Sequence, residues 1–180
     1  MRIGTILAVA LCACAAAFAQ EAKSVEKLAP YYPTPETVVE RMLKLGGLKA
    51  GEKMFDLGSG DGRIVIMAAE KFKADATGVE FDADLAKESS ARIRSLGLEK
   101  RARIIQGDIA KQDFSSAALL TVYLLPTSNS KIRPMLEKQL KPGTRIVAHD
   151  FTFQDWTPVK EEHIEDDGEG RSHTLYLYVR

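Results

Sequence analysis

Short apolar runs alternate with amphipathic segments between residues 50 and 151. The runs have the length of buried strands, and the segments between them carry apolar residues at helical spacing. Such alternation predicts a parallel sheet covered by helices on both faces. We expect strands over 52–57, 75–81, 102–108, 118–125 and 144–151, and helices over 62–72, 82–97 and 129–140 with Pro134 near the start of the last one.

The two ends of this alternating region carry further elements. Thr34 is expected to cap a helix that has Pro35 at its first position and ends at Gly46-Gly47. After residue 151, strands over 157–166 and 173–180 flank the turn-forming stretch "DGEGRS", which predicts an antiparallel hairpin. The expected fold class is α/β, a doubly wound Rossmann-like seven-stranded sheet, mostly parallel, with a C-terminal antiparallel hairpin, in one domain over 31–180.

The first nineteen residues have the pattern of a secretory signal peptide. One arginine precedes an apolar run that ends in small residues, with cleavage expected after Ala19. An uncleaved anchor, a lipoprotein signal at Cys14 and a buried helix of the fold are the alternatives. Residues 20–30 are polar and predict a tether. Because of the signal peptide, the domain is expected to be exported, to a periplasm or outside the cell.

Charge and cysteine content narrow the function classes. The 180 residues include 25 basic and 25 acidic ones, so no electrostatic footprint points to nucleic acid or an anionic membrane. Both cysteines, Cys12 and Cys14, lie in the leader. A chain cleaved after Ala19 has no disulfide, no thiolate metal site and no cysteine nucleophile.

The glycine-rich turn "DLGSGDGR" follows the first expected strand and opens a helix. A phosphate-binding P-loop needs Gly-Lys-Ser/Thr at its end, which is absent here. The dinucleotide fingerprint needs a third glycine where Arg63 stands, so NAD-dependent chemistry fits poorly. S-adenosylmethionine lacks a pyrophosphate and carries a sulfonium and an ammonium, so it tolerates the carboxylates of Asp56 and Asp61 beside the glycines.

Acidic residues end the three strands at this edge of the sheet. Glu80 lies near the expected ~20 residues after the glycines, where a carboxylate can accept from both ribose hydroxyls. Asp108 follows the third strand and is placed to meet the adenine amino group. The carboxyl ends of strands are where open α/β sheets bind ligands. The alternatives are that Asp56 only caps or satisfies backbone at a strand end, that Glu80 is an ordinary solvated strand terminus, and that Asp108 is a plain turn residue.

These motifs resemble the class I S-adenosylmethionine-dependent methyltransferases over residues 31–180. More narrowly, "YYPTPETVVERML", "DLGSGDGRIVI", "GVEFD", "VYLLP" and "LKPGTRIVAHDF" are similar to a group of small single-domain enzymes. That group includes mitochondrial lysine methyltransferases acting on membrane proteins. The resemblance implies that residues 32–34 fold over the cofactor. The expected cofactor-binding residues are Thr34, Asp56, Gly58, Ser59, Gly60, Asp61, Gly62, Glu80, Phe81, Asp108, Ile109 and Tyr123.

The methyl acceptor is expected at the end of the fourth strand. Enzymes that methylate amino groups of nucleic acids often carry Asn/Asp-Pro-Pro-Tyr there, whereas this chain has Tyr-Leu-Leu-Pro. The departure argues against adenine or glutamine amide acceptors and leaves lysine, small amines, hydroxyls and carboxylates open. Among these, a protein lysine is expected slightly ahead of a small molecule, and no nucleic-acid partner is expected. The candidate catalytic residues are Tyr32, Tyr123, His149 and Asp150, the last two as a base or a hydrogen-bonding gate; Pro126 and Asn129 are further candidates to line the acceptor slot.

Other polar and aromatic residues carry weaker predictions. His163 and His173 are expected to be structural, and no spacing of histidine and acids indicates a metal. Trp156 is expected to pack under a loop rather than to wall the acceptor pocket. The acidic stretch 161–170 is expected to be solvated, with docking of a basic substrate as the alternative. The oligomeric state is not predicted.

The leader and the methyltransferase motifs point to different compartments, because S-adenosylmethionine is made in the cytosol. The true start could lie downstream, which would make the enzyme cytoplasmic, or the cofactor could reach the exported compartment by another route. The remaining alternative is a non-catalytic protein that binds S-adenosylmethionine or a nucleoside.

Overall fold

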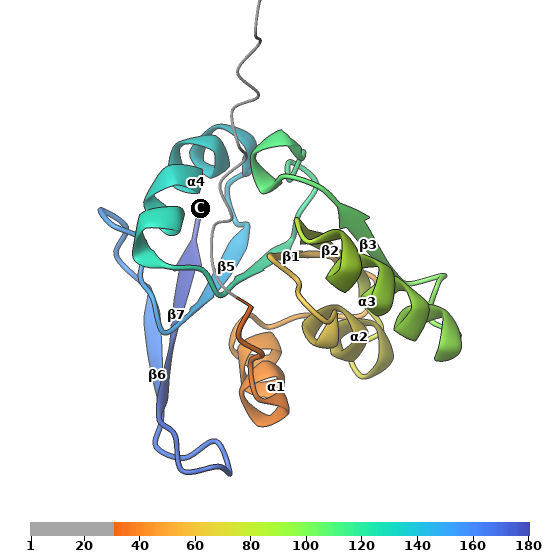
Figure 1. The fold of residues 1–180 in the computed structure, drawn as a ribbon. Helices are drawn as coiled ribbons and strands as arrows, with labels where there is room; N and C mark the ends of the chain where they lie inside the picture. The colour runs from red at the N-terminus through yellow and green to blue at the C-terminus, as the bar shows by residue number, and fades with distance from the viewer. Residues whose placement is uncertain (1–30) are drawn as a thin grey trace, which may run out of the picture.

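The computed structural model describes residues 31–180. The signal peptide and the tether predicted from the sequence lie outside the described residues. One seven-stranded sheet forms the centre of the domain, in the order β3-β2-β1-β4-β5-β7-β6 (Figure 1). Its strands are β1 (Lys53–Leu57), β2 (Asp75–Glu80), β3 (Ala102–Gln106), β4 (Leu119–Val122), β5 (Arg145–His149), β6 (Lys160–Ile164) and β7 (His173–Val179). The predicted fold class is confirmed.

The first five strands are parallel and mostly buried. All four residues of β4 and the last four of β1 are buried, as expected for strands covered on both faces. Asp56 of β1 lies opposite Gly78 of β2 on one side and Thr121 of β4 on the other. Residues at one register position of neighbouring strands share a face, so this pairing brings the Thr121 side chain to Asp56.

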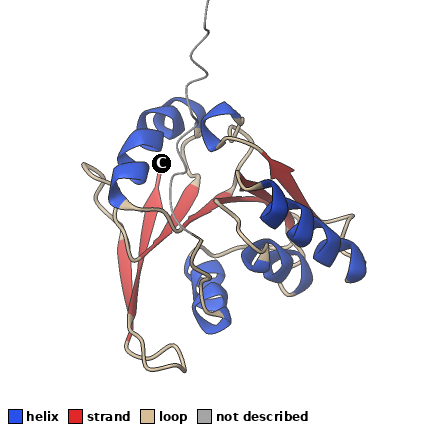
Figure 2. Ribbon diagram, viewed as in Figure 1, coloured by secondary structure: helices blue, strands red, loops and turns tan. Residues whose placement is uncertain are grey.

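Helices cover both faces of the sheet, as Figures 1 and 2 show. Helices α1 (Glu36–Leu45), α2 (Arg63–Glu70) and α3 (Ala83–Ser95) lie on one face, and α4 (Pro126–Gln139) lies on the other, next to the short 3₁₀ helix η1 (Ile109–Lys111). Each face has its own apolar cluster. One cluster contains Val38, Val39, Met42 and Leu43 of α1, and the other contains Ile132 and Leu136 of α4.

Two helix starts differ from the sequence expectation. Pro35 is the N-cap of α1, not its first residue, and the Thr34 hydroxyl makes no capping hydrogen bond because it contacts His149 instead. Helix α4 begins at Pro126, so Pro134 lies in its interior. A proline at the first helical position is favourable because its fixed φ suits the helix, and this signal at Pro126 marks the true start.

The C-terminal hairpin is the element that completes the sheet edge. Strand β7 pairs antiparallel with β5, and β6 pairs antiparallel with β7. The Asp150 backbone N–H donates to the Thr174 carbonyl at 2.8 Å, which extends the β5–β7 pairing past the end of β5. The hairpin therefore brings β7 residues to the carboxyl end of β5. Within residues 31–180, no helix is long and apolar enough to cross a membrane.

Candidate active site

The glycine turn connects β1 to α2 in a conformation that other residues rarely adopt. Gly58, Gly60 and Gly62 have φ values of 83°, 51° and 77°. A Cβ atom at Gly60 would lie 2.7 Å from the Tyr31 ring, so the aromatic ring packs directly on the backbone of the turn. The turn is fastened to β2, because the N–H groups of Gly58 and Ser59 both donate to the Val79 carbonyl. Glycine is needed here both for φ and for close approach.

Asp56 presents a buried carboxylate beneath this turn. The residue is 2% exposed, and its Oδ1 accepts a hydrogen bond from the Thr121 hydroxyl at 2.7 Å. Its Oδ2 has no hydrogen-bond partner among the described residues. Burial raises the pKa of Asp56 to about 7, with Thr121 opposing the shift and the charges of Glu80 and Asp61 adding to it. A buried carboxylate with an open oxygen can hold a cation.

Glu80 at the end of β2 holds the turn as well as facing the edge of the sheet. Its Oε2 accepts from the Gly60 N–H at 2.7 Å, and its Oε1 accepts from the Asp82 N–H at 2.8 Å. Each oxygen keeps one lone pair for a further donor, so both could still accept from ribose hydroxyls. That predicted contact stays a prediction. The backbone bonds were not predicted, because the sequence does not show that residue 80 lies against the turn.

Asp61, predicted to contact the cofactor, forms ion pairs with two arginines, and its cofactor contact stays a prediction. Its carboxylate makes a bidentate ion pair with Arg63, with the shortest contact at 2.7 Å, and lies 3.7 Å from Arg92. Burial raises the pKa of Asp61, but the hydrogen bonds and charge of Arg63 lower it more, so the net shift is downward. Arg63 also donates to the Thr34 carbonyl at 2.8 Å. The pair thus ties residues 31–35 to the glycine turn.

The remaining predicted cofactor residues lie at the ends of β2 and β3. Asp108 caps η1 through the Ala110 N–H, which is the turn role weighed as its alternative. Ile109 is 6% exposed and belongs to an apolar cluster, whereas Phe81 is 40% exposed. A side chain as open as that of Phe81 can stack on a planar ring. The predicted adenine contact of Asp108 stays a prediction.

Orphaned polar atoms at the turn match the charges of S-adenosylmethionine. Asp56 Oδ2 and Ser59 Oγ are buried without hydrogen-bond partners among residues 31–180. Buried polar atoms without partners are rare and call for a ligand or water. The ammonium or the sulfonium of the cofactor supplies a positive charge that can balance the buried Asp56 carboxylate. The residues therefore fit this cofactor at the carboxyl edge of β1 and β2.

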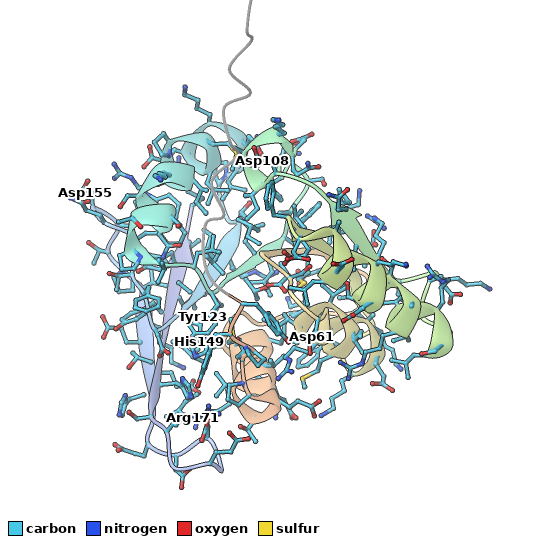
Figure 3. The ribbon with its side chains drawn as sticks, viewed as in Figure 1. Asp61, Asp108, Tyr123, His149, Asp155 and Arg171 are labelled. Atoms are coloured by element: carbon cyan, nitrogen blue, oxygen red, sulfur yellow. The ribbon has the colours of Figure 1, made fainter. Side chains whose placement is uncertain are left out.

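The predicted acceptor residues lie together at the ends of β4 and β5. The Tyr123 ring stacks on His149 with 3.9 Å between centroids, and both are labelled next to each other in Figure 3. The Tyr123 hydroxyl donates to Asp150 Oδ2 at 3.4 Å. Burial raises the pKa of Tyr123 to about 12, and the charge of Asp150 adds to the shift. Tyr123 therefore stays protonated at neutral pH and has one oxygen lone pair available.

His149, predicted as a base or a hydrogen-bonding gate, is fully buried in this structure. It is 0% exposed, and its two nitrogens lie 3.2 Å from Thr34 Oγ1 and 2.9 Å from His173 Nδ1. Burial lowers the pKa of His149 to about 4, although the charge of Asp150 opposes the shift. The histidine is neutral at physiological pH and acts as the platform beneath Tyr123.

The hairpin contributes residues that the sequence pattern does not place in the site. His173, expected to be structural, lies 3.2 Å from Asp150 Oδ2 and 3.2 Å from Asp167 Oδ2. Arg171 donates to the Tyr32 hydroxyl at 2.7 Å, which holds the strap of residues 31–34 against the hairpin. Nothing local in "RSHTLYLY" indicates these contacts, because they depend on the pairing of β7 with β5.

Of three further residues, Asn129 and Trp156 are packing groups, and the expected place of Pro126 at the acceptor slot stays a prediction. The Asn129 amide donates to the Phe151 and Thr152 carbonyls, so it holds the segment after β5 rather than facing an acceptor. Pro126 begins α4. Trp156 packs against Phe153 and Tyr178, and its indole N–H donates to Glu137, which confirms the packing interpretation.

The acidic stretch 161–170 uses much of its charge internally. Glu162 forms an ion pair with Arg41 at 2.6 Å, and Asp167 forms one with Arg171 at 2.9 Å. Burial raises the pKa of Asp167, but the N–H groups of Glu169 and Arg171 and the side chains of His173 and Arg171 lower it far more. These contacts tie the stretch to the rest of the fold, while Glu165 and Glu169 remain largely exposed, as expected for a solvated stretch.

Known proteins with similar sequences are methyltransferases. The chain is 43% identical over 151 residues to the protein-lysine N-methyltransferase of Saccharolobus islandicus, covering 83% of this chain and 92% of that protein. It is 30% identical over 130 residues to the adenine nucleotide translocase lysine N-methyltransferase of Mus musculus, covering 72% of this chain but only 56% of that protein.

The structural comparison agrees on the fold and the cofactor. A crystal structure of an RNA methyltransferase from Salinibacter ruber, in complex with S-adenosyl-L-homocysteine, superposes with a TM-score of 0.76 at 40% identity, covering 82% of this chain and 93% of that one. The family profile of the ANTKMT methyltransferase domain matches residues 56–160, which run from the buried carboxylate of β1 to the first residue of β6. The chain therefore belongs to the ANTKMT methyltransferase-domain family and is a class I S-adenosylmethionine-dependent methyltransferase.

Proposed function

We propose that the acceptor is the side-chain amine of a protein lysine. The observation that carries this proposal is the 43% identity to a protein-lysine N-methyltransferase that this chain matches over 92% of its length. The mouse relative is likewise named for a lysine of a protein. The Tyr-Leu-Leu-Pro sequence at the end of β4 supports the same acceptor class, since it departs from the motif common among enzymes that methylate nucleic-acid amino groups.

The residues around Tyr123 suit an amine that must arrive uncharged. S-adenosylmethionine supplies an electrophilic methyl group on a sulfonium, so the protein mainly aligns the nucleophile and excludes water. The Tyr123 hydroxyl donates to Asp150, which leaves its oxygen to accept a hydrogen bond from the incoming amine. Desolvation in this half-buried site disfavours the ammonium form and lowers the lysine pKa. The proton leaves to solvent before the nitrogen attacks.

The strap of residues 31–34 is proposed to complete the site. Tyr31 lies on the glycine turn, Tyr32 is held by Arg171, and the Thr34 carbonyl is held by Arg63. Tyr31 and Tyr32 are 43% and 53% exposed. These contacts place two open aromatic rings between the cofactor side and the acceptor side, where they can exclude water from the reacting atoms.

RNA is a second candidate acceptor, because the Salinibacter ruber structure is described as an RNA methyltransferase. The charge balance of the chain speaks against it. With 25 basic and 25 acidic residues, the sequence lacks the excess of positive charge that phosphate contacts require. Lysine therefore remains the favoured acceptor.

Methyl transfer from radiolabelled S-adenosylmethionine tests the proposal. The purified chain is incubated with a total protein extract, with the same extract after its lysines have been acetylated, and with total RNA. We expect label in the untreated protein alone, and mass spectrometry should locate it on lysine. Label that persists in the acetylated extract, or that appears in RNA alone, would contradict lysine methylation. The Asp56→Asn variant controls for transfer that does not depend on the cofactor site.

A further inference from the structure

Three ligand-type atoms meet behind the Tyr123 ring. His149 Nε2 lies 2.9 Å from His173 Nδ1 and 3.4 Å from Asp150 Oδ2, and His173 Nδ1 lies 3.2 Å from the same oxygen. Both histidines are buried, at 0% and 5% exposed, and the Asp150 side chain is 26% exposed. This His149–Asp150–His173 cluster is formed by the end of β5 and the start of β7.

The spacing of these atoms matches the edges of a small coordination polyhedron. Zinc binds imidazole nitrogen and carboxylate oxygen at about 2.0–2.2 Å with tetrahedral geometry, so neighbouring ligand atoms lie about 3.3 Å apart. The three observed separations, 2.9, 3.2 and 3.4 Å, bracket that value. An ion could therefore contact all three atoms without a change in the backbone.

The outer nitrogens of both histidines already have the partners that metal-bound histidines use. His149 Nδ1 lies 3.2 Å from Thr34 Oγ1, and His173 Nε2 lies 3.2 Å from Asp167 Oδ2. Ligating histidines almost always donate their other N–H to an oxygen, which fixes the ring orientation. Donation from both outer nitrogens leaves a lone pair on each inner nitrogen, facing the Asp150 carboxylate.

Asp150 is held in this place by the backbone. Its φ of 57° is uncommon for a non-glycine residue, and its Oδ1 accepts from the Thr174 N–H at 2.9 Å. Residues in such conformations persist where the surrounding structure determines them, and they concentrate at functional sites. The arrangement directs Oδ2 toward the two histidines.

We propose that His149, Asp150 and His173 form a binding site for one divalent transition-metal ion of the zinc class. Imidazole nitrogens suit zinc and its neighbours, whereas magnesium prefers oxygen ligands in octahedral geometry. The carboxylates of Asp150 and Asp167 balance the charge of the ion, and the exposed side of Asp150 leaves a fourth position for water. The sequence predicted no metal, because its ligands are 24 residues apart and only the β5–β7 pairing joins them.

A bound ion would fix the position of the acceptor tyrosine. The ligand Asp150 accepts from the Tyr123 hydroxyl, and the ligand His149 supports the Tyr123 ring. The Thr34 contact to His149 adds the strap to the same unit. The ion is thus a positioning element that joins the strap, the end of β5 and the hairpin, and its binding can be measured without any methyl acceptor.

The test measures zinc and cobalt binding to the full chain. The chain has three histidines and two cysteines, so Cys12 and Cys14 are first replaced by serine to remove competing thiolates. Chelator-treated protein is titrated with Zn²⁺ by calorimetry and with Co²⁺ by absorption spectroscopy, with Mg²⁺ as the comparison ion. Asp150→Asn retains a residue that tolerates positive φ. His173→Gln removes a ligand, and His163→Ala is the matched control, since His163 is an exposed hairpin histidine.

We expect one zinc or cobalt ion per chain, the visible bands of four-coordinate cobalt, and no magnesium binding. Asp150→Asn and His173→Gln should each weaken zinc binding at least tenfold, and His163→Ala should leave it unchanged. X-ray absorption spectroscopy of the zinc-loaded chain that keeps His149, Asp150 and His173 should show two imidazoles bound to zinc. This result does not depend on how the ligand variants fold. Absence of stoichiometric binding, or unchanged binding in both ligand variants, would overturn the proposal.

Discussion

Asp56→Asn should stabilise the cofactor-free domain at high pH and weaken cofactor binding. The folded-state pKa of Asp56 is about 7, above the ordinary value of 3.8, so the folded state binds this proton more tightly than the unfolded state. The contribution to stability is therefore largest at low pH and declines as pH rises toward about 7. Asparagine resembles the protonated carboxyl group, keeps an acceptor for the Thr121 hydroxyl and never ionises.

The size of the effect follows from the shift. Each pKa unit corresponds to about 1.4 kcal/mol, so the raised pKa of Asp56 costs the fold about 4 kcal/mol at about pH 8, where the folded state holds an ionised carboxylate, and about 1.5 kcal/mol at about pH 5, where the folded state keeps the carboxyl group protonated. The new amide N–H group lacks a partner among the described residues, which costs about 1–3 kcal/mol at either pH. The difference between the two pH values, about 2.5 kcal/mol, is the part that depends only on ionisation.

Thermal unfolding of both proteins at the two pH values measures that difference. A domain of this size shifts its Tm by about 2–4 °C per kcal/mol, so the Tm of Asp56→Asn minus that of the unsubstituted protein should rise by about 5–10 °C from low to high pH. Asp155→Asn is the control for generic effects of the substitution, since Asp155 is exposed on another part of the molecule (Figure 3).

Cofactor binding supplies the second half of the prediction. S-adenosylmethionine affinity of the unsubstituted protein should fall as pH decreases below about 7, because protonated Asp56 no longer attracts a cation. Asp56→Asn should bind at least tenfold more weakly at high pH, as measured by calorimetry. A Tm difference that does not change with pH would refute the buried, titrating carboxylate. Unchanged affinity in the variant would refute its role in the cofactor site.

Four shorter predictions follow from the site and the leader. Gly60→Ala and Gly143→Ala should both lower the Tm, because both positions have positive φ. Only Gly60→Ala should weaken cofactor binding, as measured by calorimetry, because its Cβ would clash with Tyr31 at the glycine turn, whereas Gly143 has open space around it. Glu80→Ala should weaken cofactor binding at least tenfold and also lower the Tm, because two backbone N–H groups lose their acceptor. Tyr123→Phe should slow methyl transfer about tenfold or more with cofactor affinity unchanged, and equal rates would exclude the hydroxyl. Terminal sequencing of the native protein should place its N-terminus after Ala19, and a retained leader would contradict export by cleavage.

The cofactor side of the site could be predicted from the sequence because its parts are local. Asp56, the three glycines of the turn and Glu80 lie within 25 residues, at the ends of two consecutive strands. Parallel strands joined by helices bring their carboxyl ends to one edge, so strand order in the chain becomes proximity in space. What the sequence missed on this side is the second use of each carboxylate, such as the hydrogen bond from the Gly60 N–H to Glu80.

The acceptor side could be predicted only in part. Tyr123 and Asp150 were expected at the ends of β4 and β5, and they lie there. His149 follows the same strand periodicity, but periodicity does not show that Thr34, 115 residues away, covers one of its nitrogens. His173 was expected to be structural because a hairpin histidine gives no sign of which strand the hairpin will join.

By itself, the sequence determined the strand and helix pattern, the glycine-rich turn and the acids at the carboxyl ends of β1 and β2, because these depend on periodicity and residue chemistry over short distances. Only the tertiary structure decided the His149–Asp150–His173 cluster and the contact of Arg171 with Tyr32, because both depend on β7 pairing antiparallel with β5. That pairing satisfies the exposed edge of β5, and it is chosen by the whole sheet rather than by any local motif.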